Sequence, residues 1–101
     1  MTRGTTPTLV YAIPYTAEQI ESGYITYVQG TKAVLEKELP GDGVTMEDGK
    51  ITINLSQEET LKLSSVSTLR HQIRLKLSDG TVVASNIISS DVKAILKDGE
   101  L

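Results

Sequence analysis

The sequence has no cysteine, phenylalanine or tryptophan, and its 101 residues include a single histidine. Without cysteine there is no disulfide framework, no thiolate zinc site and no thiol nucleophile. One histidine cannot supply the three or four nitrogen or sulfur ligands that zinc takes at recognisable spacing. Small secreted scaffolds depend on such staples, so we expect an intracellular or virion setting, no metal and no cofactor.

Long apolar runs are missing as well. The N-terminal stretch MTRGTTPTL has one arginine but lacks the apolar segment of a signal peptide, and nothing in the chain approaches a membrane span. We therefore expect no secretion by a signal peptide and no membrane partner. The net charge is −3 and the isoelectric point is near 5.0, so a phosphate backbone meets a weakly repulsive molecule. Nucleic acid is not an expected partner.

The composition that remains is that of a small globular protein. Apolar residues make up 39% and charged residues 23% of the chain, and its length suffices for one aliphatic core. Glycine, proline and aspartate recur about every ten residues, a spacing typical of a sandwich or barrel. We expect a single domain over 1–101, with an extended leader over 1–7 and a frayed tail over 97–101.

Alternating apolar and polar residues predict the strands. A first strand covers 8–14, and Pro14 ends it because proline has no N–H to donate to a sheet. Strands over 24–29 and 33–39 are expected to form a hairpin, since Gly30 suits a bulged connection between them.

Two Asp-Gly steps, Asp48-Gly49 and Asp79-Gly80, predict two further hairpins. Each step suits a type I′ turn, in which both central residues have positive φ. Apolar residues alternate before and after these turns and, with those of the other strands, define an aliphatic core. The predicted core consists of Leu9, Ile13, Ile25, Leu35, Ile51, Ile53, Leu55, Leu61, Ile73, Leu75, Val83 and either Ile87 or Ile88.

One stretch, LSQEETLKL at 55–63, departs from the strand pattern. The Ser56 side chain can accept from the Glu59 N–H while the Glu59 carboxylate accepts from the Ser56 N–H, which is a capping box. This predicts a short helical crossover near 57–62 that carries the chain from one sheet to the other. The whole pattern predicts an all-β, immunoglobulin-like antiparallel β-sandwich of about seven strands.

Two charged stripes are the candidate functional residues. Each occupies alternate positions of a predicted strand, so its members share one face. Two interpretations stay open: a solvated face with weak cross-strand ion pairs, or a surface that meets a partner subunit. The candidate partner surface consists of Glu36, Glu38, Arg70, Gln72, Arg74 and Lys76.

Catalysis is not expected. His71 lies on the apolar side of its predicted strand and is interpreted as a core-edge or interface histidine. The sequence offers it neither the orienting carboxylate nor the nucleophile that a general base requires. Tyr11, Tyr24 and Tyr27 are expected to be half-buried strand residues, with a sugar-stacking or interface patch as the alternative.

Three stretches, RGTTPTL at 3–9, LSQEETLKL at 55–63 and residues 72–101, together resemble short proteins encoded in prophages of Gram-positive bacteria, among tail and baseplate genes. The last hairpin and the apolar strand after it are similar to the immunoglobulin-like N-terminal domain of phage baseplate upper proteins. The resemblance implies a non-enzymatic virion protein, assembled in the bacterial cytoplasm, that binds other tail or baseplate proteins or itself as a homo-oligomer. The alternative function is a carbohydrate- or cell-surface-binding module.

Overall fold

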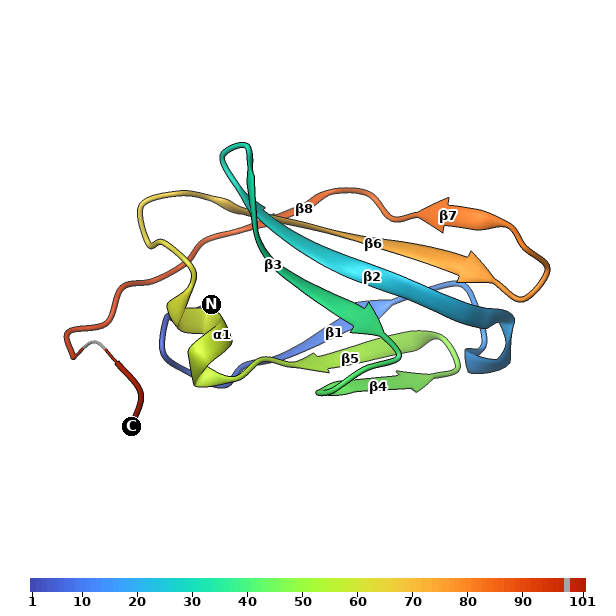
Figure 1. Ribbon diagram of the computed structural model, residues 1–101, viewed down its shortest axis with the longest axis horizontal. Helices are drawn as coiled ribbons and strands as arrows, with labels where there is room; N and C mark the ends of the chain where they lie inside the picture. The colour runs from blue at the N-terminus through green and yellow to red at the C-terminus, as the bar shows by residue number, and fades with distance from the viewer. Residues whose placement is uncertain (98) are drawn as a thin grey trace.

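Two antiparallel sheets lie face to face in the computed structural model, which describes residues 1–97 and 99–101 (Figure 1). The smaller sheet has the order β1-β5-β4, with bounds Thr8–Ala12, Lys50–Asn54 and Val44–Glu47. The larger sheet has the order β3-β2-β6-β7, and β8 also pairs with β6. Its bounds are Lys32–Leu39, Ile20–Gln29, Leu69–Leu77, Val82–Ala84 and, for β8, Ile88–Ser90. The all-β, immunoglobulin-like sandwich expected from the sequence is confirmed.

The described residues form eight strands, because the expected last strand is divided into β7 and β8. Ser85 lies at the division, where its backbone N–H donates to the Ile73 carbonyl at 2.8 Å. Its side-chain oxygen accepts from the Ile73 N–H at 3.0 Å, so a side chain replaces one bond of the ladder. The register of β8 against β6 is shifted by one residue relative to β7, since Ala84 faces Arg74 but Ile88 faces His71.

The predicted core residues lie in the core except at its C-terminal end. The core also contains buried residues that were not predicted: Tyr11, Ile20, Tyr27, Leu39, Leu63 and Leu69. Buried members of the predicted list are Ile25, Ile51, Ile53, Leu55, Ile73 and Leu75. Half-buried members are Leu9, Ile13, Leu35, Leu61 and Val83. Ile87 and Ile88 are 58% and 41% exposed, so the expectation that one of them fills the core is wrong. They lie at the sheet edge, where a side chain has neighbours on one side only, and the buried Val92 completes the core instead.

The two Asp-Gly steps form the predicted hairpin turns, but neither turn is of type I′. Gly49 and Gly80 have φ of +82° and +91°, while no non-glycine residue in the described part of the chain has positive φ. The aspartates keep ordinary backbone angles, and their carboxylates accept hydrogen bonds from backbone N–H groups. Asp79 Oδ1 accepts from the Thr81 N–H and Asp48 Oδ1 accepts from the Ala17 N–H, both at 2.9 Å. Ala17 begins the short helix η1, Ala17–Gln19, before β2.

The predicted crossover is present as helix α1, Gln57–Leu61, between β5 of the smaller sheet and β6 of the larger one (Figure 1). Its capping box is complete. The Glu59 N–H donates to Ser56 Oγ at 3.1 Å, and the Ser56 N–H donates to Glu59 Oε1 at 2.9 Å. The fully buried Thr60 hydroxyl donates to the Thr5 carbonyl at 2.8 Å, which fixes the helix against the N-terminal segment.

Ser56→Ala is expected to lower the free energy of unfolding by about 1 kcal/mol, because it leaves the Glu59 N–H without its side-chain acceptor. Urea unfolding followed by circular dichroism measures the loss. Ser65→Ala, in the exposed loop before β6, is the matched control and should change stability little. Equal stability of both variants and the wild type would contradict the capping role.

The N-terminal residues expected as an extended leader make a bridge and a turn. Thr2 pairs with Lys93 in a parallel bridge, and the Arg3 side chain donates to the carbonyls of Leu63 and Leu61 at 2.6 and 2.9 Å. These bonds satisfy acceptors at the end of α1. The tail expected to fray, 97–101, includes residue 98, which lies outside the described residues.

Candidate functional site

Both charged stripes lie on one surface, the solvent side of β3, β2 and β6, which we call the outer face. The opposite sides of these strands carry buried residues such as Ile25, Tyr27 and Ile73, so alternate residues point outward. Strand β2 separates the acidic stripe on β3 from the basic stripe on β6. The outer face consists of the six predicted residues, Glu36, Glu38, Arg70, Gln72, Arg74 and Lys76, together with Ser22, Tyr24, Thr26 and Val28 of β2.

Tyr24 is at the centre of the outer face and is 45% exposed. It is paired across the sheet with Glu38 on one side and with Arg74 on the other. The Tyr24 hydroxyl donates to Glu38 Oε1 at 3.3 Å, and this carboxylate raises the pKa of the Tyr24 hydroxyl. Among the residues that the structure describes, the Arg74 guanidinium makes no hydrogen bond or ion pair. One row across the sheet therefore presents a carboxylate, an exposed ring and an unpaired cation.

The neighbouring row on the outer face has a carboxylate on β3 and a neutral amide on β6. Thr26 is paired with Glu36 on β3 and with Gln72 on β6, and its hydroxyl donates to Glu36 Oε2 at 3.4 Å. The two residues at the ends of the basic stripe, Arg70 and Lys76, contact other groups of the same chain. Arg70 bonds the Gly30 carbonyl, and Lys76 lies 3.8 Å from a Glu21 carboxylate oxygen.

Lys37 lies between the two stripe carboxylates in sequence but points to the other side of β3. Its ammonium is 2.9 Å from Glu59 Oε2, and the two side chains are mostly buried. Burial alone raises the pKa of the Glu59 carboxyl, but the Ser56 N–H and the Lys37 ammonium lower it further than burial raises it. Lys37 thus ties edge strand β3 to α1, and an inward charge on an edge strand also discourages unspecific strand pairing.

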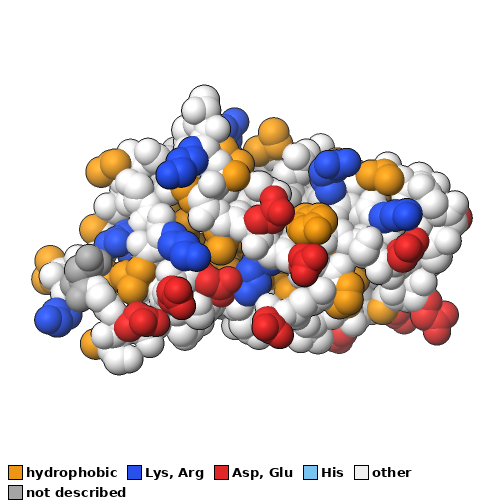
Figure 2. All heavy atoms as spheres, viewed as in Figure 1, with side chains coloured by type: hydrophobic (Ala, Val, Ile, Leu, Met, Phe, Trp, Pro, Cys, Tyr) orange, Lys and Arg blue, Asp and Glu red, His pale blue; other side chains and the backbone are white. Residues whose placement is uncertain are grey.

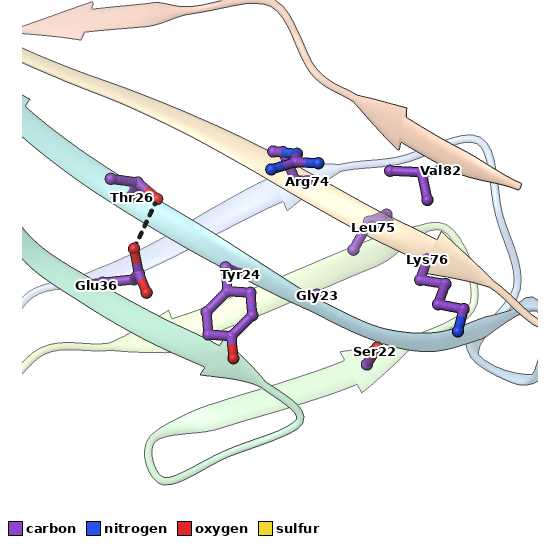
Figure 3. A pocket seen from close by; sticks show the side chains of 9 residues that line it. All are labelled: Ser22, Gly23, Tyr24, Thr26, Glu36, Arg74, Leu75, Lys76 and Val82. Atoms are coloured by element: carbon purple, nitrogen blue, oxygen red, sulfur yellow. Dashed lines mark hydrogen bonds between the residues drawn. The ribbon is translucent and has the colours of Figure 1, made fainter.

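Two shallow, open hollows mark the outer face. The first, of about 380 Å³, lies where the strands pass Gly23, and its exposed lining includes Tyr24, Glu36, Arg74, Lys76 and Val82 (Figure 3). The second, of about 220 Å³, is next to it and is lined by Thr26, Val28, Arg70, His71, Gln72 and Ile87. Figure 2 shows acidic and basic side chains around apolar ones on this side of the molecule. Such a surface offers a partner hydrogen bonds, charge and a ring, but its described residues place no nucleophile beside a base.

His71, the other residue singled out from the sequence, lies inside the sandwich in a polar cluster. It is 7% exposed, its Nδ1 is 2.8 Å from the Tyr11 hydroxyl, and its ring stacks on Tyr27 with centroids 5.5 Å apart. The Tyr11 and Tyr27 hydroxyls are 3.2 Å apart. Tyr27 is fully buried and Tyr11 is 7% exposed, so the expectation that these two tyrosines are half-buried is wrong, and neither ring is open for a sugar to stack on. The interpretation of His71 as a core-edge residue agrees with this position.

The cluster joins the two sheets through hydrogen bonds and ring contacts. The Ser90 hydroxyl lies 3.4 Å from His71 Nε2, and no carboxylate of the described residues bonds the ring. Burial lowers the pKa of His71 and raises that of the Tyr11 hydroxyl, so both side chains are neutral near pH 7. In the described part of the chain no group of three histidine, aspartate or glutamate side chains is arranged to hold a metal ion. Sequence reasoning missed this cluster, because its members are distant along the chain and no local pattern joins them.

Acidification is expected to weaken the fold through His71. Because its folded pKa is lowered, the unfolded chain takes up a proton near pH 6.5 before the folded chain does. The stabilisation is therefore complete above about pH 6.5 and is lost as the pH falls toward the folded pKa. Urea unfolding at about pH 7 and about pH 5.5 measures the change, and His71→Gln should remove most of it. An equal pH dependence in wild type and variant would contradict this assignment.

No helix in the described residues is long and apolar enough to cross a membrane. Comparison with protein-family models, curated proteins and solved structures gave no match to this chain.

Proposed function

We propose that this chain is a non-enzymatic assembly module that acts through protein–protein contacts on its outer face. The observation that carries the proposal is the row Glu38, Tyr24 and Arg74. It places an exposed ring between a carboxylate and a guanidinium that makes no hydrogen bond or ion pair with the described residues. Tyrosine and arginine are the residue types that contribute most at protein interfaces. Tyr24 and Arg74 stand on the central strands β2 and β6, and Glu38 stands on edge strand β3, which Lys37 ties to α1, so the row is held in place and needs little ordering on binding.

The setting we propose is the tail or baseplate of a phage or prophage, with assembly in the bacterial cytoplasm. The support for it is the sequence resemblance in residues 3–9, 55–63 and 72–101. These stretches have clear structural uses here: the first and second meet where Thr60 bonds Thr5 and Arg3 bonds the end of α1. The third contributes to the basic side of the outer face.

Purification of tail particles from an induced lysogen tests the proposal. Particles should contain this protein in constant proportion to the other tail proteins, and the double variant Tyr24→Ala, Arg74→Glu should be incorporated poorly. Glu47→Arg, exposed on β4 of the smaller sheet, is the control for a changed surface charge. Absence of the protein from the particles would contradict the tail assignment, and normal incorporation of the double variant would contradict the use of the outer face.

A carbohydrate-binding module is the second candidate, and the hollow beside Tyr24 is the observation in its favour. Glu36 and Arg74 line that hollow, so a sugar stacked on the ring would find acceptors and donors within it. A glycan array with wild type and Tyr24→Ala separates the two functions. Specific glycan binding that is lost in the variant favours the carbohydrate function, and no binding by the wild type removes it.

A further inference from the structure

Acidic and basic side chains lie on opposite sides of the outer face. Strand β3 contributes the carboxylates and β6 contributes the cations. Strand β2 lies between them and, apart from Glu21 beside Lys76, has uncharged residues on this face. At the level of Tyr24, Glu38 lies one strand away on one side and Arg74 one strand away on the other. Neighbouring strands are about 4.8 Å apart, so the backbone positions of Glu38 and Arg74 lie at about equal distance on either side of Tyr24. The Tyr24 hydroxyl itself donates to Glu38 Oε1 at 3.3 Å.

This arrangement decides how two copies can meet face to face. A two-fold axis along β2 exchanges the two sides of the face, so the acidic stripe of each copy covers the basic stripe of the other. A two-fold axis across the strands keeps the sides, so acid covers acid and base covers base. Like charges placed opposite each other are strongly unfavourable at an interface, so the charge pattern selects the first arrangement.

We propose that the protein forms a weak two-fold dimer through the outer face, with the axis along β2. In this dimer Glu38 of each copy faces Arg74 of the second copy, and Glu36 faces Gln72. Tyr24 lies on the axis and packs against Tyr24 of the second copy, which covers its exposed ring. This proposal rests on the proposed function, because it names a second copy of the protein as the partner that binds the outer face.

The size of the face sets the expected strength. Strand β2 has ten residues and so is about 33 Å long, and three strands together are about 14 Å wide. Two such faces bury roughly 900 Å² in total, which is below the size of standard stable complexes. We therefore expect a dissociation constant in the micromolar range or weaker. Subunits should exchange between dimers faster than the duration of a measurement.

Charge reversal in separate copies tests this geometry directly. Glu38→Arg places an arginine opposite Arg74 of the second copy, and Arg74→Glu places a glutamate opposite Glu38, so each variant alone should dimerise at least about tenfold more weakly. Mixed in equal amounts, the two variants should recover the wild-type affinity, because both cross-copy pairs become opposite in charge. Analytical ultracentrifugation across the micromolar range measures all four samples, and Glu47→Arg on β4 is the control that should behave like the wild type.

The outcomes separate this proposal from the assembly function. A wild type that is monomeric at every concentration, or a mixture that does not recover, would overturn the two-fold dimer. If Arg74→Glu then still reduces incorporation into tail particles, the outer face binds an unlike protein and the assembly function stands. Should a charge reversal unfold the chain, as judged by circular dichroism, Glu38→Gln and Arg74→Gln take its place, and unchanged dimerisation of both would overturn the proposal equally.

Discussion

Replacing Ile53 with aspartate is expected to leave the protein unfolded. Ile53 is fully buried, and its strand β5 is the central strand of the smaller sheet, with Leu9 of β1 on one side and Val44 of β4 on the other. A carboxylate at this position would be buried in an aliphatic core with no partner. The cost is on the order of 5 kcal/mol or more, comparable to the whole stability of a small domain.

Thermal unfolding followed by circular dichroism checks this result, and Asn54→Asp is the matched control. Asn54 is the next residue of the same strand, but it is exposed, and its side-chain oxygen accepts from the Thr8 hydroxyl at 2.7 Å. Aspartate keeps an acceptor there, so the control should melt cooperatively near the wild-type temperature. A cooperative transition of unchanged midpoint in Ile53→Asp would show that β5 does not have the predicted inward register.

Features of the fold that depend on near neighbours in the sequence could be predicted. Alternation placed Ile51, Ile53 and Leu55 on one face, because side chains in a strand alternate between its two sides. The capping box was predictable because Ser56 and Glu59 are three residues apart, which is the distance at which helix-start hydrogen bonds form. The strand pattern before residue 56 and the helix start at Ser56 together predicted the helical crossover between the sheets.

Features that depend on packing between distant segments could not be predicted. Tyr11, Tyr27 and His71 meet only because β1 of one sheet lies against β2 and β6 of the other. The division of the last strand depends on Ser85, whose hydroxyl takes a ladder position that no local pattern marks. That division leaves the side chains of Ile87 and Ile88 at the sheet edge, so the predicted end of the core was wrong.

The candidate surface was predictable in its residues but not in its arrangement. Alternation identified the charged stripes on 36–38 and 70–76, because the apolar residues of these two strands lie on the opposite side of the strand from the stripe. Sequence reasoning could treat the stripes as complementary in charge but could not place them relative to each other, because that depends on the strand order. The order β3-β2-β6 brings them onto one face, with Tyr24 between them. Opposite charge on the two sides of one face is what makes pairing between copies geometrically possible.

Gly23→Ala is expected to be the most damaging of the small substitutions, at about 3 kcal/mol. Gly23 faces inward on β2 between Leu39 and Leu75, and a Cβ built there overlaps the Arg74 carbonyl oxygen and lies 2.8 Å from Leu75 Cδ2. The carbonyl belongs to the backbone of β6, so relief requires the two central strands to move apart. Urea unfolding measures the loss, and Gly30→Ala is the control, because its φ is +64° with open space around the new methyl group.

The control separates crowding from backbone strain. Gly30→Ala introduces only the cost of a left-handed alanine, about 1 kcal/mol, whereas Gly23→Ala adds atoms where the strands already touch. A loss at Gly23 no greater than that at Gly30 would contradict the close approach of β2 and β6. The same crowding acts on the outer face, since Gly23 precedes Tyr24 and its methyl group would press on the Arg74 backbone. Where enough Gly23→Ala remains folded at low temperature, its dimer should therefore be weaker than that of Gly30→Ala, because Tyr24 and Arg74 no longer keep their spacing across the sheet.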